Sequence, residues 1–124
     1  MKKRLFVSFD FDNDRVLKDF IVAQARLPDS PFEITDLSLK EAAPEPTWES
    51  KARLAISRAE LFMIMLGPQT ARAPGVLKEL AMAIELGKPR FQIIGYRDGS
   101  ASWAVQNGGH TYAWSWDNLK QLLA

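Results

Sequence analysis

The sequence feature that most constrains the fold is the run Leu61–Leu66, in which six consecutive residues are apolar. Glu60 precedes this run and Gly67-Pro68 follows it, so it is too short for an ordinary helix and ends at a turn. An apolar run of this length without alternation is typical of a strand buried on both faces of its sheet. Such strands occur in parallel sheets whose two faces are covered by helices.

Four further segments have the composition of strands, and amphipathic helical patterns separate or follow them. The sequence predicts the additional strands at Leu5–Phe9, Phe32–Leu37, Arg90–Tyr96 and Thr111–Trp114. The residues expected on the buried helix faces are Val16, Leu17, Phe20 and Ile21 in the first helix, Trp48, Ala52, Ala55, Ile56 and Ala59 in the second, Val76, Leu77, Leu80, Ala81 and Ile84 in the third, and Leu119, Leu122 and Leu123 in the last.

This alternation of strands and helices predicts a flavodoxin-like three-layer α/β sandwich. We expect one five-stranded parallel sheet of order 2-1-3-4-5, with helices on both faces. The chain has 124 residues, of which 47% are hydrophobic, which suits a single domain, 1–124, with a core that needs no metal or disulfide. In such a sheet, ligands bind outside the carboxyl ends of the strands where the strand order reverses, here between the first and third strands.

Composition excludes several classes of function. The chain has no cysteine, which excludes thiol chemistry and zinc–thiolate sites and fits a reducing compartment. A net charge of +1 gives no electrostatic footprint for nucleic acid or an anionic membrane. No segment approaches the roughly 20 apolar residues of a membrane span. We therefore expect a cytoplasmic protein that binds neither nucleic acid nor membrane.

The familiar cofactor motifs are absent from the sequence. The turn Gly67–Thr70 lacks the Gly-Lys-Ser/Thr ending of a phosphate-binding loop, and no G-x-G-x-x-G follows the first strand. His110 is the only histidine, so neither a metal site nor a catalytic triad can be argued from it. We expect no metal or cofactor to be required.

Three aspartates follow the first predicted strand, at positions Asp10, Asp12 and Asp14. Such a cluster could hold magnesium, as in response-regulator receivers. A receiver also needs an aspartate at the end of its third strand, where this chain has Leu66-Gly67. We therefore interpret Asp12 and Asp14 as helix caps and solvated turn residues.

Glu79 is the sharpest candidate for a functional side chain. It lies in the first two turns of the third predicted helix, close to the carboxyl edge of the sheet. At about 100° per residue, it lies well off the apolar stripe centred near Leu80 and Ile84, from where it could project into a cleft at this edge. The alternative interpretation is an ordinary solvated glutamate near a helix N-terminus.

Two stretches of the chain carry a family resemblance. The first, Lys3–Asp10, is a strand that ends in Ser-Phe followed by an acidic residue. The second, Ala59–Ile94, combines a strand, a G-x-x-T turn, a helix with the pattern hydrophobic-x-x-Glu-hydrophobic, and the ending Gly87-Lys88-Pro89. Together they resemble TIR-like domains, most closely the small family to which the TIR-like sensors of the Thoeris anti-phage system belong.

The resemblance implies a site. In enzymes of that family the helix glutamate is catalytic in cleaving the nicotinamide–ribose bond of NAD, and it corresponds to Glu79 in this chain. One carboxylate near the ribose can stabilise a ribosyl cation, and nicotinamide leaves as a neutral molecule that needs no general acid. The residues that correspond to the nucleotide-binding edge and to the cover of the ribose are Ser8, Phe9, Asp10, Asp36 and Trp48.

The activity implied by the resemblance is that of an NAD glycohydrolase or ADP-ribosyl cyclase, with NAD as substrate and a nucleotide signal in anti-phage defence as product. The implied partners are further copies of the chain, or another TIR-like or effector protein. Two alternatives stay open. One is a non-enzymatic TIR-like module that binds a nucleotide or a protein, and the other is an enzyme similar to nucleoside 2-deoxyribosyltransferases, which also use a helix glutamate.

Overall fold

Strands and helices alternate along the chain in the predicted order. The computed structural model describes residues 3–10, 13–37, 47–96 and 104–123, and for 15, 35–37 and 47 it describes the backbone alone. The elements are β1 (Lys3–Ser8), α1 (Arg15–Ala25), β2 (Phe32–Leu37), α2 (Thr47–Arg58), β3 (Leu61–Leu66), the short 3₁₀ helix η1 (Thr70–Arg72), α3 (Pro74–Glu85), β4 (Arg90–Ile94), β5 (Thr111–Ala113) and α4 (Trp116–Leu123).

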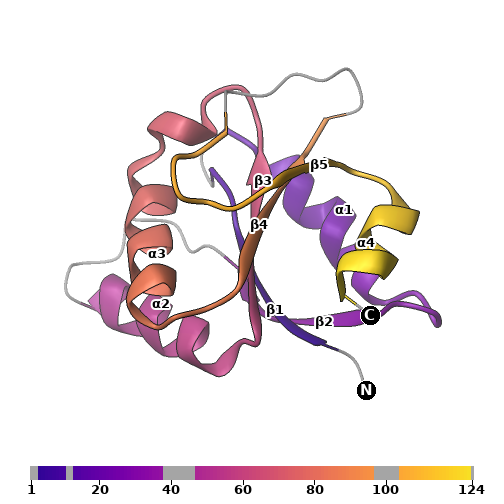
Figure 1. Ribbon diagram of the computed structural model, residues 1–124, viewed down its shortest axis with the longest axis horizontal. Helices are drawn as coiled ribbons and strands as arrows, with labels where there is room; N and C mark the ends of the chain where they lie inside the picture. Colours follow the sequence, from indigo (N-terminus) through magenta and orange to yellow (C-terminus); the bar gives the residue numbers. More distant parts are fainter. Residues whose placement is uncertain (1–2, 11–12, 38–46, 97–103, 124) are drawn as a thin grey trace.

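The five strands form one parallel sheet of order β2-β1-β3-β4-β5, which confirms the predicted topology. Helices α2 and α3 cover one face of the sheet, and α1 and α4 cover the other (Figure 1). The strands are slightly shorter at their carboxyl ends than predicted, because β1 ends at Ser8, β4 at Ile94 and β5 at Ala113. Phe9 and Tyr96 therefore lie beyond their strands, at the edge where the site is expected.

Alternating side chains of the central strands supply two cores, one on each face of the sheet. Phe6 of β1 and Phe62 of β3 point towards α2 and α3, and their rings stack with centroids 5.6 Å apart. Leu5 and Val7 point the other way and pack with the buried residues of α1 and α4. Strand β1 is therefore buried on both faces of the sheet, as a short run of consecutive apolar residues predicts.

The predicted buried face of α3 is wrong by a partial rotation of the helix. Leu77 and Ile84 are 43% and 41% exposed, whereas Val76, Leu80 and Glu79 are buried. The sequence offers two overlapping apolar stripes, and contact with the sheet and with α2 selects the one that contains Val76 and Leu80. Because that stripe includes position 79, the glutamate faces inward.

The first helix shows a similar deviation. Leu17 and Ile21 are buried as predicted, but Phe20 is 54% exposed and Val16 is also exposed. Phe20 lies edge-to-face against Trp114, with ring centroids 6.1 Å apart, instead of entering the core. The predicted faces of α2 and α4 are confirmed, with Leu122 only partly buried.

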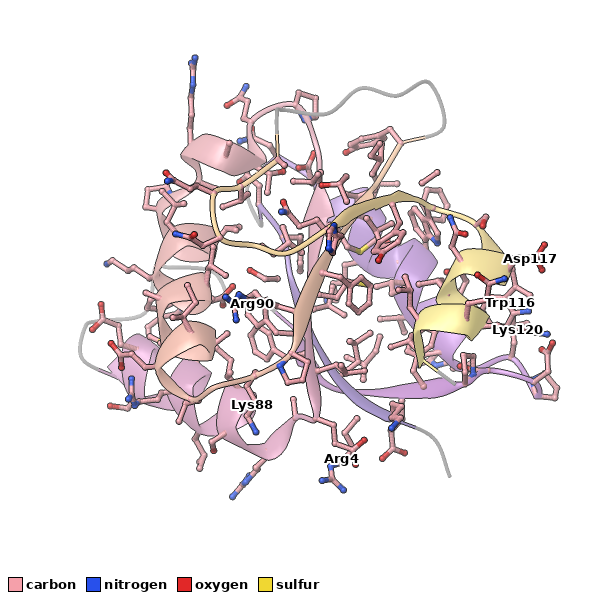
Figure 2. The ribbon with its side chains drawn as sticks, in the orientation of Figure 1. Arg4, Lys88, Arg90, Trp116, Asp117 and Lys120 are labelled. Atoms are coloured by element: carbon pink, nitrogen blue, oxygen red, sulfur yellow. The ribbon has the colours of Figure 1, made fainter. Side chains whose placement is uncertain are left out.

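The carboxylate of Asp29 links helix α4 to the turn before β2 through two hydrogen bonds. Asp29 Oδ2 accepts hydrogen bonds from Lys120 Nζ at 2.8 Å and from Trp116 Nε1 at 3.3 Å. Lys120 and Trp116 project from the outer side of α4 (Figure 2). The hydrogen bond from Lys120, and then that from Trp116, lower the pKa of Asp29 below its usual value.

The Gly87-Lys88-Pro89 segment has a structural explanation. Gly87 has a φ of +68°, which ends α3 in the left-handed region that favours glycine. Lys88 Nζ then donates to the carbonyls of Ser57 at 3.0 Å and Ala59 at 2.8 Å, which lie at and just after the end of α2. The carbonyl of Pro89 accepts a hydrogen bond from β3. Lys88 and Arg4 lie at the end of the sheet where β1 begins (Figure 2).

Replacing Lys88 tests this account. Lys88→Met keeps the aliphatic stem but leaves two carbonyl groups without their charged donor, so we expect the free energy of unfolding to fall by about 1–2 kcal/mol. Urea denaturation measures it, and Lys51→Met, on the exposed side of α2, is the control. Equal stabilities of the two variants would show that Lys88 does not fasten α2.

Candidate functional site

Most of the buried polar side chains that the structure describes lie at the carboxyl edge of the sheet. They come from the ends of β1 and β3 and from the first turns of the helices that follow them. These residues are Ser8, Asp10, Asp14, Thr70 and Glu79. This is the edge at which parallel sheets of this order bind their ligands.

Ser8 and Glu79 form the innermost contact of this edge. Ser8 is the last residue of β1, on the same face as Phe6, and its Oγ donates a hydrogen bond of 2.7 Å to Glu79 Oε1. The two residues are 0% and 1% exposed. The interpretation of Glu79 as a solvated helix residue is therefore wrong. So is the placement of Glu79 off the buried stripe, because that stripe runs through position 79.

Asp10 organises the turn between β1 and α1. Its Oδ2 accepts a hydrogen bond of 2.7 Å from Asn13 Nδ2, and its carbonyl accepts one of 2.8 Å from the backbone N–H of Asp14. No group of three acidic or histidine side chains in the described ranges is placed to hold a metal ion. Asp10 thus lies at the edge as the sequence predicts, as part of a hydrogen-bonded turn.

Asp14 is a residue whose role the sequence did not reveal. It occupies the N-cap position of α1 but makes no capping hydrogen bond with its side chain, and it is only 1% exposed. Its Oδ1 accepts a hydrogen bond of 2.7 Å from the hydroxyl of Tyr96, the second residue after β4. Its interpretation as a solvated cap is therefore wrong, because the side chain turns inward across the sheet edge. Asp12 lies outside the described residues.

The carboxyl group of Asp14 rests on the backbone of Gly67. A Cβ at position 67 would overlap Asp14 Oδ2, so the Asp14 side chain keeps this position only beside a glycine. The backbone N–H of Gly67 donates to Thr70 Oγ1 at 2.6 Å, which closes the turn. Since β3 lies between β1 and β4, Asp14 reaches over the end of β3 to meet Tyr96. A glycine directly after the central strand was the sequence signal for this close approach.

The environment of Asp14 favours its neutral form. Burial is the largest influence and raises the pKa of the carboxyl group above its usual value, and the nearby charge of Asp10 raises it further. The hydrogen bond from Tyr96 acts in the opposite direction and is outweighed. The carboxyl group of Asp14 therefore holds its proton to a higher pH than a solvated aspartate does.

Phe9 and Trp48 are buried, and Asp36 is described only by its backbone. Phe9 belongs to the core beneath α1 and α4. Trp48, at the start of α2, has Lys78 Nζ 5.6 Å from its ring centroid. Asp36 pairs with Phe6 in the sheet, and its side chain lies outside the described part. A contact of these three residues with a nucleotide stays a prediction.

The raised pKa of Asp14 predicts a pH-dependent stability. Above the ordinary pKa of 3.8, the unfolded chain loses this proton before the folded chain does, so stability falls as pH rises towards the raised value. The Asp14→Asn variant lacks the carboxyl group, so it also lacks this pH-dependent contribution to stability. The free energy of unfolding of the wild type, minus that of the variant, should decrease in urea titrations as the pH rises above the ordinary pKa of 3.8. A difference that stays constant, or increases, would contradict the assignment.

A double-mutant cycle tests the contact of Asp14 with Gly67. Gly67→Ala introduces a Cβ into the carboxyl group, and we expect it to cost about 1–3 kcal/mol of stability. In an Asp14→Ala background the same change should cost clearly less, because the overlapping atoms are gone. Additive effects in the cycle would mean that glycine is needed at position 67 for another reason.

Comparison with known proteins gives a fold-level match. No protein-family model and no curated protein sequence matches the chain. Among solved structures, the chain is similar to the CMP N-glycosidase BcmB of Clostridium botulinum, with a TM-score of 0.57 and 17% sequence identity over 97% of this chain and 98% of that one. In the described parts of this chain, every helix is too short or too polar to cross a membrane. The chain thus has a flavodoxin-like α/β fold that it shares, over nearly its whole length, with this enzyme.

Proposed function

We propose that this protein is an N-glycosidase that hydrolyses the bond between the ribose and the base of a nucleotide, with Glu79 as its catalytic carboxylate. One observation carries the proposal. Glu79 is buried on an otherwise apolar helix face, at the ligand-binding edge of the sheet, with its carboxylate held by Ser8.

Burial of Glu79 is difficult to explain by stability alone. Its neighbours Val76 and Leu80 belong to the core on this face of the sheet, and an apolar side chain at position 79 would extend that core. Moving a carboxylate out of water costs several kcal/mol, which an apolar side chain at this position would not incur. Carboxylates kept in such surroundings are concentrated in active sites.

The chemistry of N-glycoside cleavage suits one oriented carboxylate. As the bond between C1′ and the base nitrogen lengthens, positive charge develops on the ribose, and a carboxylate beside C1′ stabilises that charge. The Ser8 hydroxyl fixes the direction of Glu79 Oε1, so that the group needs little reorganisation during the reaction. Because Glu79 is 1% exposed, a substrate reaches it only when neighbouring chain moves aside.

Two classes of nucleotide are candidate substrates. The family resemblance implies NAD, and the enzyme whose solved structure has a similar fold is a CMP N-glycosidase. Both molecules carry a base on a ribose 5′-phosphate, so the same carboxylate chemistry applies to both. Analysis of the products would distinguish hydrolysis from cyclisation. A signalling role in anti-phage defence and self-association through this domain stay predictions.

Base release by matched variants tests the proposal. The wild type is incubated with NAD and separately with CMP, and free nicotinamide or cytosine is quantified by chromatography. We expect Glu79→Gln to lower the rate by about 10²-fold or more, because the amide cannot stabilise the developing cation. Glu85→Gln is the control on the same helix, since Glu85 is exposed and forms an ion pair with Arg53 of α2 at the surface.

The outcomes separate the candidate functions. Base release by Glu79→Gln at the rate of the wild type would remove Glu79 from the catalytic role. If the wild type bound nucleotide but released base from neither substrate, the protein would be a nucleotide-binding module and not a glycosidase.

A further inference from the structure

The second buried carboxyl group at this edge has an atom with no partner. Asp14 Oδ1 accepts from Tyr96, but Asp14 Oδ2 is buried and makes no hydrogen bond within the described parts of the chain. A buried polar atom left in this way costs about 1–3 kcal/mol. Glycine at position 67 leaves just enough room for it. A polar atom of a bound ligand would satisfy Oδ2.

The surroundings of Asp14 indicate what kind of ligand atom this is. Two titratable groups of the described residues act on the carboxyl group, Tyr96 after β4 and Asp10 after β1. In the turn after β3, the carboxyl group lies against Gly67. Among the described residues no ion pair to Asp14 occurs, and burial together with the charge of Asp10 raises the pKa of its carboxyl group. Because Oδ1 accepts from the Tyr96 hydroxyl, the neutral form of the carboxyl group donates from Oδ2, and the ligand atom that meets this form is an acceptor.

Asp14 and Glu79 lie at the same edge of the sheet, and they come from its opposite faces. Glu79 is bonded to Ser8 at the end of β1, and Asp14 lies on Gly67 at the end of β3. These strands are neighbours, with Ser8 in register with Ile64, and Gly67 lies beyond Ile64 by roughly 10 Å at about 3.3 Å per residue. The two carboxyl groups come from α3 on one face and from the start of α1 on the other (Figure 1).

We propose that Asp14 binds the base of the nucleotide and donates the proton with which that base leaves. This inference rests on the proposed function. It also narrows the substrate class to nucleotides with an uncharged nucleobase, whose ring nitrogen or carbonyl oxygen is the acceptor that Asp14 Oδ2 lacks.

The atoms balance in a two-step sequence. In the first step the C1′–N bond breaks, its electron pair goes to the base, and the Asp14 proton moves to an acceptor of the base, which leaves neutral. The Glu79 carboxylate stabilises the ribosyl cation. In the second step water adds to C1′, and the proton that this water loses returns to Asp14. The products are the free base and ribose 5-phosphate.

Two substrates that differ only in the leaving base separate this role from a structural one. Cytosine needs a proton to leave CMP as a neutral molecule, whereas nicotinamide leaves nicotinamide mononucleotide neutral without one. Loss of a general acid typically lowers a rate by about 10²–10⁴-fold. We therefore expect Asp14→Asn to lower cytosine release from CMP by at least about 10² more than it lowers nicotinamide release.

The pH profile supplies a readout that loss of packing would not move. For cytosine release, kcat of the wild type should fall on the alkaline side as Asp14 loses its proton. Tyr96→Phe removes a hydrogen bond that favours the ionised form, so this limb should move to higher pH. In Asp14→Asn the limb should be absent. Circular dichroism and thermal unfolding confirm that the variants are folded.

Every outcome of this experiment bears on the proposal. Equal losses on the two substrates, or an alkaline limb that Tyr96→Phe leaves in place, would overturn the role of Asp14, while Glu79→Gln could still abolish base release and sustain the proposed function. Cleavage of nicotinamide mononucleotide but not of CMP by the wild type would also overturn it. Release of neither base would remove the proposed function and this inference with it.

Discussion

The hydrogen bond between Ser8 Oγ and Glu79 Oε1, at 2.7 Å, is the interaction on which the account of the site depends. It joins the end of a central strand to the helix on one face of the sheet. The alternation of side chains along β1 places Ser8 on the same face as Phe6, towards α3. The rotation of α3 brings Glu79 inward with Val76 and Leu80. A carboxylate is thereby fixed at the one edge of this fold where the strand order reverses.

The same edge holds a second carboxyl group in different surroundings. Asp14 reaches across Gly67 to Tyr96, so that segments following three neighbouring strands meet in one contact. Burial and the charge of Asp10 raise the pKa of its carboxyl group, and the hydrogen bond from the Tyr96 hydroxyl opposes them only partly.

The fold was predictable from the sequence because its central strands β1 and β3 are buried on both faces and consist largely of consecutive apolar residues. The positions of β3 and the strand order follow from those runs and from the helices between them. The faces of α1 and α3 did not follow, because Phe20, Leu77 and Ile84 offer each helix a second apolar stripe that local spacing cannot reject. The contact of Asp14 with Tyr96 joins residues 82 positions apart, and no local pattern signals it. The helix motif predicts Glu79 as a candidate functional residue. Its burial does not follow from the motif, because it depends on the rotation of α3.

A crystal structure of the Glu79→Gln variant with bound CMP would test the central claim most directly. The slow variant should retain the intact nucleotide. The account predicts that C1′ of the ribose lies within about 3.5 Å of the side chain at position 79, as a group that acts on the reacting carbon requires. A nucleotide bound at the opposite edge of the sheet, or with its phosphate instead of its ribose at position 79, would contradict the claim that this edge cleaves N-glycosidic bonds.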